Sequence, residues 1–117
     1  MEKYVINYSL NGNLTGVIVP NSQFTTASGY TNNCRLVKVG NMMSLTMDVQ
    51  GSYPANTLIS PIIIPAAYRP QKSIIGICSN GANVPVVGTL SIKTDGSVNS
   101  YMPTTTSAIF GSYSWTI

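Results

Sequence analysis

Hydrophobic and polar residues alternate over short stretches of the chain, and no stretch repeats its hydrophobic residues at the helical period. Glycine, proline and asparagine interrupt the alternation roughly every 8 to 12 residues, as they do in β-sandwiches and barrels. The pattern predicts an all-β fold, an antiparallel sandwich or barrel. Besides the two hairpins described next, we expect strands at residues 4–9, 14–19, 58–64, 72–79, 84–87 and 108–117.

The first hairpin joins Cys34–Val39 to Met42–Val49 through the two-residue loop Gly40-Asn41. Such loops favour primed turns, and the turn fixes which residues face each other. On the face assigned to the core, the register places Leu36 opposite Leu45 and Cys34 opposite Met47. On the other, more polar face it places Arg35 opposite Thr46 and Val37 opposite Ser44.

The second hairpin joins Thr89–Lys93 to Ser97–Tyr101 through Thr94-Asp95-Gly96. A three-residue loop that ends in glycine fits a type I turn closed by a left-handed glycine bulge. This register puts Ile92 opposite Val98 on the inner face. The outer face then carries Thr89, Ser91, Lys93, Ser97, Asn99 and Tyr101.

The composition suits one domain that associates with copies of itself or with a partner. The chain has 117 residues, of which 44% are hydrophobic, so it can form a core. Only 8% are charged, which gives weak protection against association. Six bases against three acids give a net charge of +3, but the bases are scattered. We therefore expect no nucleic-acid binding.

Neither the cysteines nor the hydrophobic runs indicate secretion or membrane insertion. Cys34 and Cys78 could form a disulfide, but each lies in an alternating apolar stretch, so we expect two buried thiols. The first ten residues contain no hydrophobic signal region, which favours synthesis in a cytoplasm. The longest apolar run, Ile62–Ala67, includes Pro65 and is too short to span a bilayer.

The ionisable residues argue against an enzyme. The chain has no histidine, which is the commonest general base and metal ligand. Its acids are Glu2 at the terminus, Asp95 in a turn, and Asp48. Nothing pairs two carboxylates, and no histidine is present to activate a thiol. We expect no catalysis, no metal and no cofactor.

With catalysis excluded, binding is the remaining class of function. Saccharides are the ligands that the side chains of this chain suit best. Aromatic rings contact the apolar side of a sugar, while amide, hydroxyl and carboxylate groups orient it. The candidate residues are Tyr101, Asn99, Ser91, Asp48, Trp115, Tyr68 and Arg69. For several of these residues a purely structural role is the alternative to ligand binding. Trp115 could be a core or interface aromatic, Asp48 a surface charge, and Tyr68 and Arg69 parts of a solvated loop. That loop is Pro65–Pro70, whose prolines remove ladder donors.

From about residue 29 to the end, the chain resembles the C-terminal head domain of phage tail or baseplate receptor-binding proteins, especially those of siphophages that infect Gram-positive hosts. The similarity rests on a strand pair, a proline-rich stretch with Tyr-Arg-Pro, a following strand, a late hairpin and an aromatic last strand. These are CRLVKVGNMMSLTMDVQG, PIIIPAAYRP, SIIGIC, Ile92–Val98 and GSYSWTI.

The resemblance implies a homotrimeric β-sandwich or barrel head at the tail tip of a virion. Such a head binds host cell-wall saccharide and other baseplate proteins without a cofactor. In lactococcal members, a histidine, an aspartate and a tryptophan near the late hairpin form the pocket. Here the tryptophan corresponds roughly to Tyr101, the aspartate position holds Ser91, and the histidine has no counterpart. The pocket therefore departs from that pattern.

The resemblance divides the chain into a head, residues 29–117, and an N-terminal part, residues 1–28. The latter contains a predicted strand pair around Asn11-Gly12-Asn13, which either completes the sheet of the head or connects it to the particle. Two other functions stay open: a structural baseplate or tail-fibre module that binds another phage protein, and a cellular carbohydrate-binding module.

Overall fold

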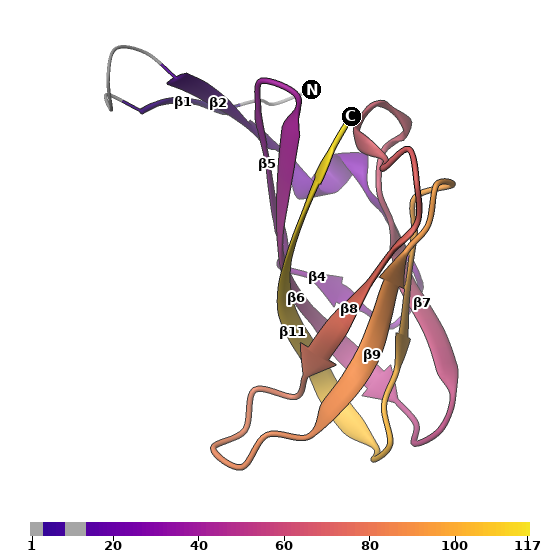
Figure 1. The fold of residues 1–117 in the computed structure, drawn as a ribbon. Helices are drawn as coiled ribbons and strands as arrows, with labels where there is room; N and C mark the ends of the chain where they lie inside the picture. The colour runs from indigo at the N-terminus through magenta and orange to yellow at the C-terminus, as the bar shows by residue number, and fades with distance from the viewer. Residues whose placement is uncertain (1–3, 9–13) are drawn as a thin grey trace.

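The computed structural model describes residues 4–8 and 14–117, and these form one antiparallel sheet curled into a half-barrel (Figure 1). The described residues contain no α-helix, only the short 3₁₀ turns η1 (Asn21–Gln23) and η2 (Ala66–Tyr68). No helix in this part of the chain has the length and hydrophobicity to cross a membrane. The predicted all-β antiparallel class is confirmed.

The described residues form eleven strands of the sheet, and ten of them follow the order β1-β2-β5-β6-β11-β8-β9-β10-β7-β3, with β4 paired to β6. Their bounds are β1 (Tyr4–Tyr8), β2 (Leu14–Val19), β3 (Thr25–Thr26), β4 (Thr31–Asn32), β5 (Arg35–Val39), β6 (Met42–Tyr53), β7 (Leu58–Ile63), β8 (Ile74–Ser79), β9 (Val87–Ile92), β10 (Ser97–Tyr101) and β11 (Thr106–Thr116).

Both predicted hairpins have the expected registers. In the β5–β6 hairpin Leu36 pairs with Leu45, and Gly40 in its loop has a φ of 58°. In the β9–β10 hairpin Ile92 pairs with Val98. The Gly96 N–H donates to the Lys93 carbonyl, and Gly96 has a φ of 86°, as a type I turn with a glycine bulge requires. Turn chemistry therefore set both registers.

Other strands differ from the prediction at their ends. The separate strand predicted at residues 84–87 is not found: residues 84–86 lie outside any strand, and Val87 is the first residue of β9, which was predicted to begin at Thr89. The side chain of Asn80 instead organises the preceding loop, because its Oδ1 accepts hydrogen bonds from the N–H groups of Ala82 and Val86. β6 continues to Tyr53, past an irregularity in its pairing with β11.

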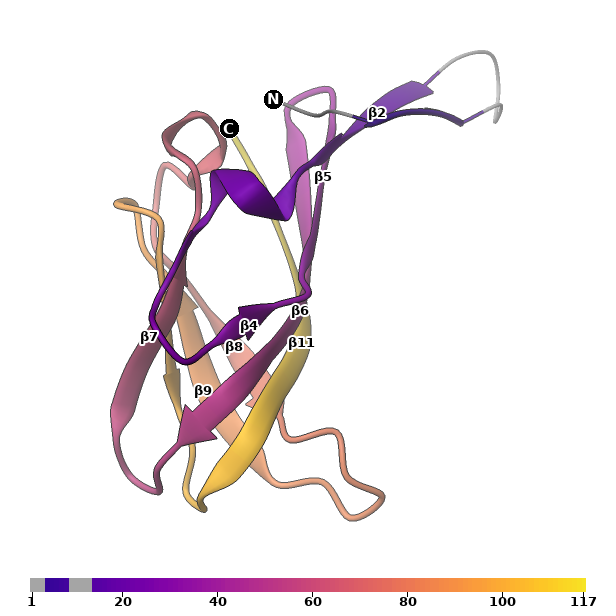
Figure 2. The ribbon, with the colours of Figure 1, turned by 180° about the vertical axis from the view of Figure 1, so that it is seen from behind.

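Residues 20–34 cross the open side of the half-barrel, which the sequence did not predict. After η1, β3 pairs with β7 and β4 pairs with β6; Figure 2 shows this segment from behind. Tyr30 on this segment packs edge-on against Tyr53, with 5.4 Å between ring centroids. Gly51 makes room for Tyr30, since a Cβ at Gly51 would overlap the Tyr30 ring.

The predicted N-terminal strand pair is present: β1 pairs with β2, and β2 continues the sheet by pairing with β5. The pair extends away from the barrel in Figure 1. Its connecting turn around Asn11-Gly12-Asn13 lies outside the described residues. The division into residues 1–28 and 29–117 stays a prediction.

The core fills the inside of the curled sheet. It includes both predicted core pairs of the first hairpin and the inner residues of the second: Cys34, Leu36, Leu45, Met47, Leu90, Ile92 and Val98. Further buried residues come from the rest of β6, from β7 and β11, and from the residue after β10: Val49, Tyr53, Ile62, Ile109 and Met102.

Cys34 and Cys78 are free, buried thiols, as predicted. Each thiol lies beside a methionine sulfur, Cys34 Sγ 3.7 Å from Met47 Sδ and Cys78 Sγ 3.6 Å from Met102 Sδ. Burial raises the pKa of Cys34 to about 11 and also raises that of Cys78. The thiolate is the reactive form of cysteine. Both thiols therefore react slowly with reagents, because they are buried and because they are protonated at neutral pH.

Without reductant, a thiol reagent is expected to titrate two thiols per chain in denaturant and to react far more slowly with the native protein. At pH 8 a thiol of pKa about 11 is ionised in only about one molecule in a thousand. A count of zero in denaturant would contradict this, because it would mean that the cysteines are oxidised.

Candidate functional site

The seven candidate residues fall in three separate places rather than in one pocket. Ser91, Asn99 and Tyr101 lie near one another on β9 and β10, where Asn99 pairs with Ser91 and Tyr101 with Thr89. Tyr68, Arg69 and Trp115 lie near η2 and the end of β11, where the indole N–H of Trp115 donates to the Tyr68 carbonyl at 2.8 Å. Asp48 lies on β6 and pairs with Phe110 of β11.

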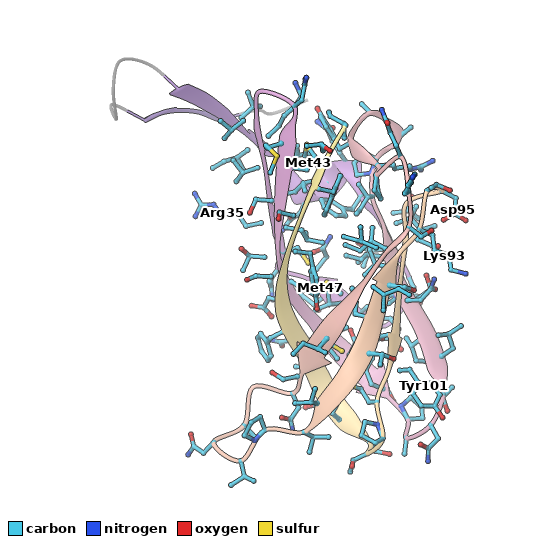
Figure 3. The ribbon with its side chains drawn as sticks, viewed as in Figure 1. Arg35, Met43, Met47, Lys93, Asp95 and Tyr101 are labelled. Atoms are coloured by element: carbon cyan, nitrogen blue, oxygen red, sulfur yellow. The ribbon has the colours of Figure 1, made fainter. Side chains whose placement is uncertain are left out.

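Tyr101 is the candidate that is most available to a ligand. It is 41% exposed, and among residues 16–117 no other aromatic side chain is exposed by more than about a third. Cross-strand pairing places it in a row with Ile77, Thr89 and Leu58, which runs over β8, β9, β10 and β7. Figure 3 shows Tyr101 near the end of the barrel opposite the C-terminus.

Asn56 contacts Tyr101 and was not among the candidates. The Tyr101 hydroxyl lies 3.5 Å from Asn56 Oδ1, at the limit of a hydrogen bond. Asn56 belongs to the turn between β6 and β7, has a φ of 56°, and donates its backbone N–H to the Met102 carbonyl at 2.7 Å. The signal in the sequence was the turn Pro54-Ala-Asn-Thr57, since asparagine tolerates the left-handed conformation.

Asn99 is a correction to the predicted outer face. It pairs with Ser91 as expected, but only 8% of its surface is exposed. The ladder between β10 and β7 shifts register beside it, because β7 has one extra residue between Ile59 and Ile62. Such bulges bend a strand, and Pro61 explains this one because it cannot donate to the ladder. Ser91, which is half-buried, remains reachable.

Tyr68 and Trp115 are core residues. Tyr68 is buried, so the predicted solvated loop is wrong for this residue: η2 turns its ring inward. Trp115 is 6% exposed, and its bond to the Tyr68 carbonyl fixes the indole. The structural interpretation of Trp115 is therefore confirmed. Arg69 is half-buried and donates Nε–H to the Ile64 carbonyl at 2.8 Å.

Asp48 is half-buried and lies apart from the other candidates. Its backbone carbonyl accepts a hydrogen bond from Asn33 at 2.8 Å, while its Oδ1 is buried without a hydrogen-bond partner among the described residues. This position differs from the freely solvated charge that the strand parity suggested.

Asp95 is a turn residue. The backbone N–H and the hydroxyl of Ser97 donate to its Oδ1 at 2.9 and 2.7 Å. These bonds hold the pKa of Asp95 below its usual value. In the described part of the chain, no three Cys, Asp or Glu side chains gather as metal ligands would.

An open groove of about 410 Å³ lies between the start of β8 and the end of β11. The two strands share one paired position, Phe110 with Ser79, and the groove lies toward their other ends. Tyr113 bridges the seam, because its hydroxyl donates to the Ile77 carbonyl. The groove is lined by Pro70, Gln71, Lys72, Ile74, Ser114, Trp115 and Thr116.

Exposed apolar side chains gather on the outer side of β8 and β9. Ile75 is 83% exposed and Ile77 67%, and Val87 is also exposed. A hollow of about 260 Å³ borders them and is lined in part by Ile77, Val87 and Phe110. We call Ile75, Ile77 and Val87 the β8–β9 strip. Contiguous exposed apolar residues of this kind mark interaction surfaces.

No protein-family model and no curated protein sequence matches the chain. Among solved structures it is similar to the head domain of phage bIL170, which is described with the receptor-binding domains of lactococcal phages. The two are 12% identical, the match covers 80% of this chain and 94% of that one, and the TM-score is 0.64. The expected resemblance is thus confirmed for the fold: this chain is built like the head domain of a lactococcal phage receptor-binding protein.

Proposed function

We propose that this chain is a non-catalytic host-adhesion head, carried at the tail tip or baseplate of a phage. The observation that carries the proposal is the structural likeness to the bIL170 head, which extends over 94% of that domain. A receptor-binding domain of that fold implies a receptor on the host surface. The scarcity of ionisable side chains agrees with binding rather than catalysis.

The ligand that we propose is a host cell-wall saccharide, bound at the exposed ring of Tyr101. A flat aromatic surface suits the C–H face of a pyranose. The carboxamide of Asn56 and the hydroxyls of Thr89 and Ser91 would supply hydrogen bonds around it. The position of Tyr101, far from the C-terminus, leaves this end of the barrel open to a host surface (Figure 3).

Tyr101→Ala is expected to abolish binding on an array of bacterial surface glycans. Alanine removes the ring while disturbing little of the core, so the melting temperature should stay within about 4 °C of the wild-type value. Tyr101→Phe keeps the ring and should retain most of the binding.

Leu58→Ala is the matched control, since Leu58 is exposed in the same cross-strand row but has no aromatic ring. Unchanged glycan binding by Tyr101→Ala, or equal loss in Leu58→Ala, would contradict the placement of the sugar at Tyr101.

The proposal includes assembly as a homotrimer through the β8–β9 strip. Three copies around an axis would bury the isoleucines of each copy against the others. The strip itself, Ile75, Ile77 and Val87, contains no charge that would have to be desolvated. The low charge of the whole chain agrees with such burial.

A second candidate is a structural baseplate module whose β8–β9 strip binds another phage protein and which binds no sugar. The strip and its hollow of about 260 Å³ favour it. Retention of neighbouring tail proteins by the immobilised chain, without any glycan binding, would select this function over adhesion.

A further inference from the structure

We propose that the groove between β8 and β11 is a second ligand site, separate from Tyr101, that selects a sugar bearing a negative charge. The ligand class is a sugar phosphate or a sugar acid. The proposal does not depend on the saccharide site at Tyr101, because the two surfaces share no residue.

The groove has the size and rigidity of a binding site. Its volume of about 410 Å³ lies within the range of small-molecule sites. Its apolar part consists of the half-buried Ile74 and the edge of Trp115, which is 6% exposed. The indole cannot turn freely, because Nε1–H donates to the Tyr68 carbonyl at 2.8 Å. The groove is therefore formed before a ligand arrives.

The remaining lining residues supply polar groups suited to a hydroxylated ligand. Ser114 and Thr116 are two residues apart on β11, so their hydroxyls project from the same side of the strand. Gln71 adds a carboxamide. Each hydroxyl both donates and accepts hydrogen bonds. Trp115, between Ser114 and Thr116, points to the other face of β11, so the ligand-facing side of the groove is mainly polar, as a hydroxylated ligand requires.

Lys72 gives the groove its charge preference. It is the one charged residue in the lining, and it is exposed. The acids of the described residues lie elsewhere: Asp48 is on β6, and the carboxylate of Asp95 accepts two hydrogen bonds from Ser97 at the hairpin turn. An ammonium group with no acidic side chain in the groove lining favours an anionic ligand.

Trp115 provides a direct test, because it is the only tryptophan and it lines the groove. Its fluorescence should change on titration with glucose 6-phosphate or glucuronate, with a Kd of about a millimolar, and at least about tenfold more weakly with glucose. A response to only one of the two anions supports the proposal and identifies the charged group. Added salt should weaken the response.

Lys72→Gln should remove at least about nine tenths of the affinity for the anionic sugar. Lys93→Gln is the matched control, because it removes the same charge at an exposed residue outside the groove and should change little. Tyr101→Ala should leave the response intact, which separates this site from the proposed adhesion site. No response to either anion, an equal response to glucose, or an unchanged response in Lys72→Gln would overturn the proposal.

Discussion

Replacing Trp115 with alanine is expected to lower the free energy of unfolding by about 3–5 kcal/mol and the melting temperature by more than about 10 °C. The side chain is 6% exposed and packs in the core, so its removal leaves a cavity. The same change leaves the Tyr68 carbonyl without its donor. Chemical denaturation of both proteins at equal concentration measures the difference.

Trp115→Phe separates the two contributions. Phenylalanine keeps an aromatic ring in the core but loses the indole N–H, so we expect a smaller loss of about 1–2 kcal/mol. A Trp115→Ala variant as stable as the wild type would mean that the indole is not part of the core, against the packing described above.

Ile75→Lys or Ile77→Lys is expected to reduce the mass in solution from three chains to one. Either substitution places an ammonium group in the middle of the β8–β9 strip, where assembly would have to desolvate it. Both side chains point outward from the barrel, so the fold should survive. Light scattering on a size-exclusion column measures the mass.

Met42→Lys is the matched control, because Met42 is also an exposed apolar residue but lies on β6, away from the strip. It should leave the mass unchanged. A wild-type chain that elutes as a monomer would contradict the proposed trimer, and a trimer insensitive to Ile75→Lys and Ile77→Lys would place the interface elsewhere.

The parts of the fold that the sequence predicted are those determined by local chemistry. Gly40-Asn41 and Thr94-Asp95-Gly96 each allow few turn geometries, and the turn determines the register of its hairpin. The core faces of both hairpins followed directly, and so did the burial of Cys34 and Cys78. Alternation along the chain was sufficient for these features.

The parts that it missed depend on contacts between distant segments. The Trp115 indole bonds to a carbonyl 47 residues away, and no periodicity reveals that Tyr68 turns inward. The bulge at Pro61 belongs to β7 but accompanies the burial of Asn99 on β10. The groove beside Lys72 lies between β8 and β11, which are distant in sequence and share a single paired position.

The candidate site was therefore predicted in part. Tyr101 projects outward as expected, because the hairpin register fixes its side of the sheet. Asn56 was missed because it reaches Tyr101 from the turn between β6 and β7, 45 residues away in sequence. Strand parity assigns a face to each residue, but it says nothing of which loop packs over that face.

The measurement that tests the central claim most directly is co-sedimentation of the purified chain with isolated cell walls of Gram-positive bacteria. Walls are compared before and after periodate oxidation, which cleaves the vicinal diols of sugars. Host adhesion through saccharide predicts that the wild-type chain sediments with the untreated walls of at least one strain, that periodate removes this binding, and that Tyr101→Ala fails to bind. Binding that survives periodate, or no binding to any wall tested, would contradict the account.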